Sequence, residues 1–182
     1  MKKKLAVLLF GALAMATIAM AGSDPMVGGA AMYPTKDIID NAVNSSDHTT
    51  LVAAVKAAGL VDTLKGPGPF TVFAPTNEAF AKLPAGTVDN LLKPENKEML
   101  TKVLTYHVVA GRLSASDLKK EIKAGNGQAS LKTVNGETLI ATMQGKNIVL
   151  RDPKGDVSTI TIPNVFQSNG VIQVVDTVLL PN

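Results

Sequence analysis

Two histidines, His48 and His107, are the residues best suited to acid–base or metal chemistry in this chain of 182 residues. The imidazole ring changes charge near neutral pH, so it serves as a general base or as a metal ligand. His48 stands in the first turn of a predicted helix, where we expect it to be exposed. His107 follows Tyr106 at the junction of a predicted helix and a predicted strand, and we expect a buried, hydrogen-bonded ring there.

The spacing of the polar residues does not select a catalytic or metal-binding set. A serine hydrolase that uses His107 needs a positioned serine, and the chain has no G-x-S-x-G pattern. It also has no E-x-x-H or D-x-D-x-D ligand pattern and no glycine-rich phosphate loop after a strand. The absence of cysteine excludes disulfides, thiolate catalysis and cysteine-ligated zinc or iron–sulfur clusters. We therefore expect no catalytic residue, no metal site and no cofactor.

Asp176 is the carboxylate with the most unusual position, because it interrupts the apolar runs 171–175 and 177–180, which are both predicted strands. Two structural roles fit it: a bulge that separates the two strands, or a carboxylate that accepts backbone hydrogen bonds. A short recognition determinant on the surface is the functional alternative. The sequence leaves these three roles open.

A segment of thirteen residues, 68–80 (GPFTVFAPTNEAF), predicts a strand, a corner and a helix in immediate succession. The aromatic and β-branched run 70–73 suits a strand, and Pro75 ends it because proline cannot donate to a ladder. Thr76 can cap the following helix by accepting from a backbone N–H one turn on. We expect Thr76 and Asn77 to fix this corner and the rest of the fold to be built around it.

Hydrophobic periodicity divides the chain into a helical first part and a strand-rich second part. Apolar residues spaced by three and four predict helices within the ranges 35–59, 87–106 and 114–122. From residue 129 onward the period changes to two, and Asn135-Gly136 predicts a hairpin with a type I′ turn. This segregation predicts an α+β fold in a single domain.

Residues 1–21 have the composition of an export signal. Three lysines precede an apolar stretch that ends in Ala-Met-Ala, the small-x-small form of a cleavage site. The stretch is too short and too rich in glycine and alanine for a stable membrane span, and no other run is long enough. We expect residues 22–34 to be a flexible segment and residues 35–182 to form the folded domain, in a secreted or periplasmic protein.

The formal net charge of +3 belongs to the export signal. That segment holds three of the 18 basic residues and no acid, so the remaining chain has 15 basic and 15 acidic residues. A neutral domain gives no reason to expect nucleic acid or an anionic membrane as partner. We expect a monomer with no membrane span.

Three ordered segments resemble the signatures of the fasciclin domain family. Residues 71–80 resemble its first box, Tyr106-His107 resembles its Tyr-His motif, and residues 169–181 resemble its second box. The resemblance covers about residues 35–181. Gln173 departs from the pattern, since many members carry histidine there, and Val175 stands where the family often has isoleucine.

The resemblance implies a fasciclin-like, wedge-shaped β-sandwich with helices packed along one edge. The two boxes would pair as neighbouring central strands, which would place Phe73 near Val174. The residues that this implies for the structural motif are Phe73, Pro75, Thr76, Asn77, Phe80, Asn169 and Gly170. The candidate binding residues by the same resemblance are Tyr106, His107 and Asp176.

The family resemblance implies a function in binding. We expect a secreted module that mediates cell adhesion through an unknown protein or carbohydrate on a cell surface or matrix. One alternative is a periplasmic carrier of an apolar ligand such as a lipid, held between the helices and the sheet. Another alternative is a periplasmic hydrolase that uses His107.

Overall fold

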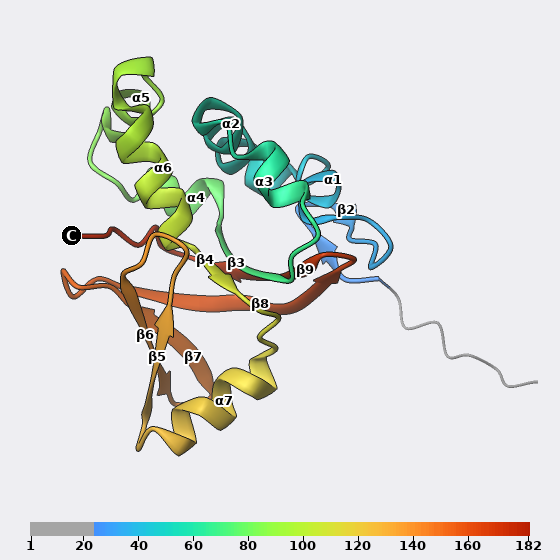
Figure 1. The fold of residues 1–182 in the computed structure, drawn as a ribbon, viewed down its shortest axis with the longest axis vertical. Coiled ribbons are helices and arrows are strands. Elements are labelled where there is room, and N and C mark those ends of the chain that lie inside the picture. Colours follow the sequence, from blue (N-terminus) through green and yellow to red (C-terminus); the bar gives the residue numbers. More distant parts are fainter. Residues whose placement is uncertain (1–23) are drawn as a thin grey trace, which may run out of the picture.

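The computed structural model describes residues 24–182 as a layer of helices over a strongly bent sheet, with one further helix at the opposite end (Figure 1). The predicted export signal at residues 1–21 lies outside the described residues. Within the described residues, no helix has the length and apolar character that a membrane crossing requires.

Seven α-helices and nine strands make up the described part of the chain. The helices are α1 (Ile38–Ala42), α2 (Thr49–Ala58), α3 (Val61–Lys65), α4 (Asn77–Ala81), α5 (Thr87–Leu91), α6 (Lys97–Tyr106) and α7 (Ala115–Ala124). The strands are β1 (Met26–Val27), β2 (Ala30–Ala31), β3 (Phe70–Pro75), β4 (Val108–Ala110), β5 (Gln128–Lys132), β6 (Thr138–Gln144), β7 (Asn147–Arg151), β8 (Val157–Gln167) and β9 (Gly170–Val175). Short 3₁₀ helices at Ser46–His48 and Pro94–Asn96 precede α2 and α6.

The two signature segments form neighbouring strands at the centre of the fold. The main sheet has seven strands in the order β4-β3-β9-β8-β7-β6-β5. Strands β3 and β9 pair in parallel, with Phe73 opposite Gln173 and Ala74 opposite Val174. This register confirms the predicted proximity of Phe73 and Val174, and the mixture of helices and strands confirms the α+β class.

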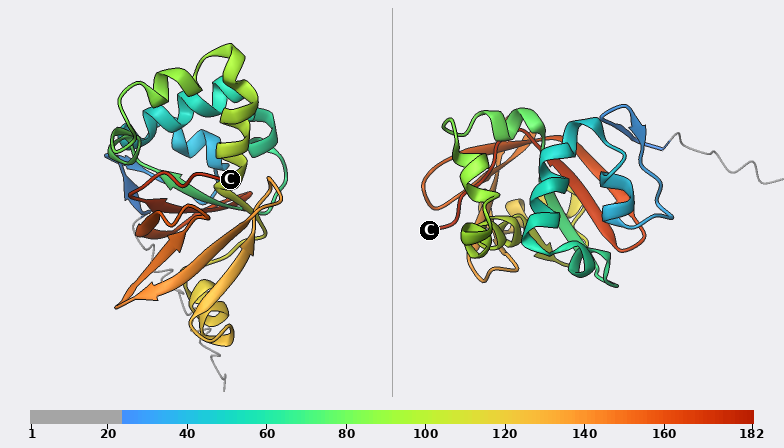
Figure 2. Two further views of the ribbon diagram at one scale, coloured as in Figure 1. Left: turned by 90° about the vertical axis from the view of Figure 1, so that its left-hand side faces the viewer. Right: turned by 90° about the horizontal axis from the view of Figure 1, so that it is seen from above.

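The two layers of the predicted sandwich belong to one sheet that bends along β8. This strand has 11 residues, and its pairing with β9 shifts register twice, between Ile160 and Ile162 and between Ile162 and Val165. Such irregularities bend a strand and increase its twist. The bend stacks the two halves of the sheet (Figure 2, left). A bridge between Val109 of β4 and Thr133 after β5 nearly closes the sheet on itself.

Two apolar cores lie on opposite faces of the central strands. The first core fills the space between helices α1–α6 and the sheet, and the second lies between the halves of the sheet and is covered by α7. Val72 and Ala74 of β3 face the first core, and Phe73 faces the second. Burial on both faces explains why β3 and β9 read as continuous apolar runs rather than as alternating ones.

The N-terminal segment differs from the flexible region expected for residues 22–34. Residues 26–31 form the β1–β2 hairpin, and the side chains of Val27 and Met32 are buried in the first core. Gly28 supports the packing, since its carbonyl oxygen accepts a hydrogen bond from Ser46 N at 3.1 Å. The hairpin is stabilised by tertiary contacts that its small-residue composition does not reveal.

The strand expected at residues 177–180 is also absent, although the segment is buried. Strand β9 ends at Val175, and Val178 and Leu179 are 3% and 0% exposed. The backbone N–H groups of Leu179 and Leu180 donate to side chains, the His107 ring and the Asp152 carboxylate, instead of to a neighbouring strand. An apolar run therefore indicated burial correctly but not the type of structure.

Candidate functional site

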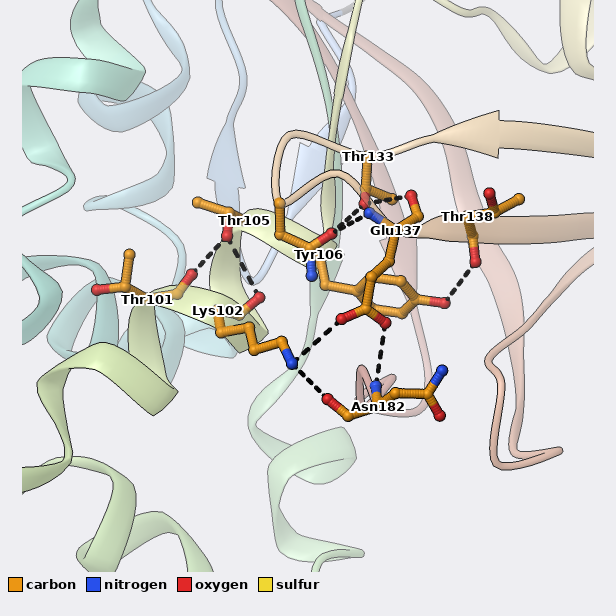
Figure 3. Close-up of polar contacts among 9 residues, drawn as sticks. Thr101, Lys102, Thr105, Tyr106, Thr133, Glu137, Thr138 and Asn182 are labelled. Carbon is orange, nitrogen blue, oxygen red and sulfur yellow. Dashed lines mark hydrogen bonds and ion pairs between the residues drawn. The ribbon is translucent and has the colours of Figure 1, made fainter.

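Tyr106 ends α6 with its side chain buried between that helix and the β5–β6 hairpin. It is 0% exposed, and its hydroxyl donates to the carbonyl oxygen of Thr138 at 3.1 Å (Figure 3). Burial raises the pKa of Tyr106 to about 12, with the carboxylates of Asp152 and Glu137 adding to the shift. The hydroxyl therefore stays protonated at neutral pH and acts as a hydrogen-bond donor inside the protein.

His107 joins α6 to the C-terminal segment through both of its ring nitrogens. Its Nε2 accepts a hydrogen bond from Leu179 N at 3.0 Å, so the ring proton is on Nδ1, which donates to the Val103 carbonyl oxygen at 2.9 Å. Burial lowers the pKa of His107, and the Val103 carbonyl and the Asp152 carboxylate offset this only in part. A neutral, fully paired ring of this kind has no free nitrogen with which to act as a base.

A polar cluster beside Tyr106 holds the last residues of the chain. The Glu137 carboxylate accepts from Asn182 N at 3.0 Å and pairs with Lys102 Nζ at 3.3 Å, while Lys102 Nζ also donates to the Asn182 carbonyl oxygen (Figure 3). The Asn182 N–H is the main reason why the pKa of Glu137 is lowered. Together with His107, this cluster fixes the C-terminal segment against α6.

Asp176 follows β9 at a different place and remains partly exposed. One carboxylate oxygen accepts from Thr159 N at 2.8 Å and from Thr177 Oγ1 at 3.0 Å. Lys82, the residue after α4, donates to the Asp176 backbone carbonyl oxygen at 2.6 Å and forms no ion pair with the Asp176 carboxylate. The structure therefore gives Asp176 one of the roles that the sequence left open, that of a carboxylate which accepts a backbone hydrogen bond. The carboxylate is partly exposed and forms no ion pair with a cationic side chain among the described residues.

The corner after β3 is fixed by the two residues expected to fix it. Thr76 caps α4 by accepting from Ala79 N at 3.3 Å. Asn77 reaches a different helix, since its side-chain oxygen accepts from Thr50 N at 3.0 Å and its amide donates to the Ser46 carbonyl oxygen at 2.8 Å. Asn77 therefore supplies the N-terminal cap of α2, which has no capping side chain of its own.

Asn169 and Gly170 connect the start of β9 to the helical layer. The Asn169 side chain accepts from Ile38 N at 3.0 Å and donates to the Leu64 and Gly66 carbonyl oxygens at 2.7 and 2.9 Å. A side chain at Gly170 would place its Cβ 2.2 Å from the Phe70 carbonyl oxygen, so this close pairing of β9 with β3 requires glycine.

Gln173 has a structural role that sequence reasoning did not assign. It is 0% exposed, accepts from Asn164 N at 2.9 Å and donates to the Leu113 carbonyl oxygen at 2.9 Å. Asn164 belongs to the irregular part of β8, and Leu113 precedes α7. The neutral amide thus connects the bend of the sheet to the helix that covers the second core, at a position where the resemblance led us to expect histidine in many relatives.

An apolar cavity of about 60 Å³ lies between the helical layer and the sheet. Its walls come from β1, α1–α3, α6 and the first-core face of the sheet, and include Val55, Val72, Leu104 and Ile172. No sequence pattern signals such a space, because it depends on how closely the helices approach the sheet.

His48 lies on the wall of this cavity and is 3% exposed, so the expectation that it would be exposed is wrong. Its Nδ1 is 2.9 Å from Ser45 Oγ, a side chain that is also buried, and its Nε2 has no hydrogen-bond partner among the described residues. Burial lowers the pKa of His48, although the nearby backbone of Ala74 raises it in part. The burial arises because the 3₁₀ turn that carries His48 packs against the sheet.

The described residues contain no group of three or more His, Asp or Glu side chains that could hold a metal ion. The arrangement consists instead of a buried Tyr-His pair, a partly exposed aspartate and a small apolar cavity. These features lie on a bent sheet with central parallel strands, in an α+β domain.

Comparison with known protein families gives a match over most of the described chain. The model of the Fasciclin domain family matches residues 46–181, so the chain belongs to this family. Protein sll1483 from Synechocystis is 43% identical over 178 residues, which are 93% of this chain and 90% of that protein.

Mycobacterial relatives match shorter parts. Immunogenic protein MPB70 from Mycobacterium bovis is 39% identical over 142 residues, covering 64% of this chain and 72% of that protein. Cell surface glycolipoprotein MPB83 from the same species is 39% identical over 100 residues, 55% of this chain and 41% of that protein.

A solved structure confirms the fold. The FAS1 domain pair from the insect cell adhesion molecule fasciclin I superposes with a TM-score of 0.69 at 18% sequence identity. The match covers 81% of this chain and 51% of that chain, so this protein spans about half the length of the domain pair.

Proposed function

We propose that this protein is a secreted or periplasmic binding module, which mediates cell adhesion or contact with a protein or carbohydrate on a cell surface or matrix. The observation that carries the proposal is its membership of the fasciclin domain family over most of the described chain. A relative named as a cell surface glycolipoprotein and a fold shared with a cell adhesion molecule support it. Binding here means docking of a preformed surface without making or breaking covalent bonds.

The geometry of His107 favours binding over hydrolysis. A general base needs a free nitrogen within hydrogen-bond reach of the proton it removes. Both nitrogens of His107 are already paired inside the protein, with Val103 and Leu179. The hydrolase alternative predicts that His107→Gln abolishes an activity, whereas the binding proposal predicts no activity that depends on this ring.

Among the candidate binding residues, we assign direct contact to Asp176 and an indirect role to Tyr106 and His107. Tyr106 and His107 are 0% and 2% exposed, so their side chains do not reach a partner in this conformation. Asp176 is partly exposed and its carboxylate has no ion pair among the described residues, which leaves a negative charge available to a cationic group. Lys82 lies beside Asp176 on the same surface, where it donates to the hydroxyl of Thr177.

Binding of the exported protein to intact cells of its own host tests the proposal. Labelled folded protein should bind in a saturable manner, and an excess of unlabelled protein should displace it. Protein unfolded in urea and diluted immediately before the assay is the control and should not compete. Binding that never saturates, or that the unfolded protein displaces equally well, would contradict a specific surface.

The apolar cavity favours a second candidate function, the carriage of an apolar ligand. The cavity lies where this alternative places it, between the helices and the sheet, and its lining is almost wholly apolar. Native mass spectrometry of the protein purified from its own host should then show an added mass that organic solvent removes. A single mass equal to that of the polypeptide would contradict this function.

A further inference from the structure

We propose that a depression bounded by β4, α7 and β5 binds the acetamido group of an uncharged N-acetylated amino sugar. The backbone of Ser130 pairs with the amide of that group, and the side chains of Glu121 and Lys132 hydrogen-bond the sugar hydroxyls. The inference goes beyond the adhesive surface proposed above, because none of the residues that contact Asp176 lines this depression.

The depression lies where the two edges of the bent sheet diverge. Strands β4 and β5 are the end strands of the sheet, and among the described residues they meet at the bridge between Val109 and Thr133. From β4 the chain runs through α7 and returns along β5, so the helix closes the third side (Figure 1). The enclosed volume of about 460 Å³ is within the range of about 300–1,000 Å³ for small-molecule sites.

Ser130 presents a backbone N–H and a C=O group to this depression. In an antiparallel pair of strands, residues that bond the neighbouring strand alternate with residues whose backbone groups face away from it. Thr133 N donates to the Glu137 carbonyl oxygen at 2.9 Å, so the register places Leu131 among the residues that bond β6 and Ser130 among those that face away. Because β5 is an end strand, no strand of the described residues pairs with Ser130 on its other side. Ser130 is exposed and lines the depression, so a ligand can reach both groups.

A secondary amide is the chemical group that matches this pair. Its C=O accepts from the Ser130 N–H while its own N–H donates to the Ser130 C=O, as a neighbouring strand would do. A continuous peptide strand does not fit, because the free edge of β5 is short. The bridge at Thr133 closes one end of it, and at the other end Gln128 N donates to the Gly125 carbonyl oxygen after α7 at 3.4 Å. An acetamido branch needs only the single residue Ser130.

An apolar floor lies beside the Ser130 edge. Val109 of β4 and Leu131 of β5 are buried in the second core, and Leu113 packs against the same core. All three residues line the depression. An acetyl methyl group that contacts this floor removes apolar surface from water and so helps to hold the amide at the edge.

The charged residues of the rim select an uncharged ligand with hydroxyl groups. Glu121 and Lys132 are exposed and line the depression, and neither forms an ion pair among the described residues. A carboxylate only accepts hydrogen bonds and an ammonium group only donates them, whereas a hydroxyl group can do both. Because the two charges are opposite and sum to zero, a neutral polyhydroxy ring matches this rim better than an ion does.

Three uncharged probes separate the acetamido group from the sugar ring. They are methyl N-acetyl-β-D-glucosaminide, methyl β-D-glucoside, in which a hydroxyl replaces the acetamido group, and N-acetylalanine methylamide, a peptide amide without a ring. Each is titrated into the exported protein at pH 7.5 while amide and methyl NMR signals are recorded. The amino sugar should shift the Ser130 amide signal and the Val109, Leu113 and Leu131 methyl signals. It should bind about tenfold more tightly than the glucoside, because it gains two hydrogen bonds and the methyl contact.

Ser130→Pro removes the N–H group that faces the depression. This group lies outside the β5–β6 ladder, so the substitution breaks no hydrogen bond of the sheet. The variant should lose most of the preference for the amino sugar, whereas the matched control Ser130→Ala keeps the N–H group and should retain it. Should Ser130→Pro not fold, nuclear Overhauser contacts in the wild type, from the acetyl methyl group to the Leu113 and Leu131 methyl groups, locate the acetamido group.

Each alternative outcome has a defined meaning. Equal affinity of the wild type for amino sugar and glucoside would overturn the role of the acetamido group, and equally tight binding of the peptide amide would overturn the assignment to a sugar. An unchanged preference in Ser130→Pro, or acetyl methyl contacts elsewhere, would overturn the role of Ser130. No shift of these signals with any probe would overturn the site. Saturable binding to host cells combined with that last result would show that the adhesive function stands without this site.

Discussion

Tyr106 and His107 stabilise the fold through contacts that can be removed separately. The Tyr106 hydroxyl makes one hydrogen bond, to Thr138, whereas its ring fills part of the second core. His107 holds Leu179 and Val103 through its two nitrogens. The effects of the hydroxyl, the aromatic ring and the imidazole can therefore be measured with different substitutions.

Tyr106→Phe should lower the free energy of unfolding by about 1 kcal/mol, because it removes a single neutral hydrogen bond and retains the ring. Urea denaturation of both proteins measures the difference. Tyr106→Ala should cost about 3–5 kcal/mol, the usual effect of deleting a large buried side chain. A smaller effect of the alanine variant than of the phenylalanine variant would contradict the packing of the ring described above.

The buried histidines predict a loss of stability in mild acid. The pKa values of His48 and His107 are both lowered in the folded protein, so the unfolded chain binds more protons as the pH falls. Their contribution is fully present above the ordinary histidine pKa of about 6.5 and decreases below it. Urea denaturation at pH 7.5, 6.5 and 5.5 should show falling stability, with a shallower decline in His107→Gln.

The acidic residues act in a separate pH range, which gives an internal control. The pKa values of Asp117 and Glu137 are lowered from ordinary values of 3.8 and 4.5, so their contributions are present above those values and are lost at lower pH. Stability that is constant from pH 7.5 to 5.5 and falls only below 4.5 would show that the histidines do not contribute.

At the level of elements, side chains from distant segments fix the ends of the short helices. Asn77 caps α2 from the corner after β3, and Asn169 joins α1 and the end of α3 to β9. Helices of five to ten residues are marginal without tertiary contacts. The helical layer therefore depends on these asparagines for its position on the sheet.

Asn77→Ala should destabilise the protein by about 1–2 kcal/mol, because the Thr50 N–H group loses its capping oxygen. Asn77→Asp is the matched control, since it keeps an acceptor for Thr50 N and loses only the donor to the Ser46 carbonyl oxygen. Amide hydrogen exchange should accelerate in the first turn of α2 in the alanine variant. Equal exchange in both variants would contradict the capping role.

The elements that the sequence predicts well are those that depend on local chemistry. The strand, corner and helix at residues 68–80 follow from the residues themselves. Strands β5 and β6 also pair around Asn135-Gly136 as expected, but the predicted type I′ turn is wrong, because Asn135 lacks the positive φ that this turn requires. Ser114 and Asp117, three residues apart, form a capping box at the start of α7, which is also a local interaction. In each case the relevant hydrogen bonds form within a few residues.

The features that the sequence does not predict depend on contacts across the fold. The β1–β2 hairpin consists of small residues and becomes ordered through Val27 and Met32, whose partners lie in later helices and strands. The segment 177–180 pairs with side chains rather than with a strand, and His48 is buried where its 3₁₀ turn packs against the sheet. The sequence singles out Asp176 as an unusual position, but its partial exposure depends on neighbours from distant segments.

At the level of the whole molecule, the central strands couple the two apolar cores. Strands β3 and β9 contribute Val72 and Ile172 to the first core, and Phe73 and Val175 to the second. A loss of packing in either core therefore weakens elements that both cores share. We expect the domain to unfold in a single cooperative transition.

Leu118→Ala tests this coupling, because Leu118 of α7 is 0% exposed in the second core. It should cost about 2–5 kcal/mol. Native-state hydrogen exchange should show the same loss of protection in α2 and α6, which lie above the first core, as in β6. Unchanged protection of α2 and α6 would show that the two cores unfold independently.

The central claim is that the folded domain binds its partner through a preformed surface that includes Asp176, and that the buried side chain of Tyr106 does not contact the partner. The most direct test compares the saturable binding of wild type, Tyr106→Phe and Asp176→Asn to host cells. Asp176→Asn keeps the acceptor for Thr159 N and removes the negative charge. We predict wild-type affinity for Tyr106→Phe and an affinity reduced about fivefold or more for Asp176→Asn. Equal binding by all three would contradict the assigned surface, and the absence of saturable wild-type binding would contradict the function.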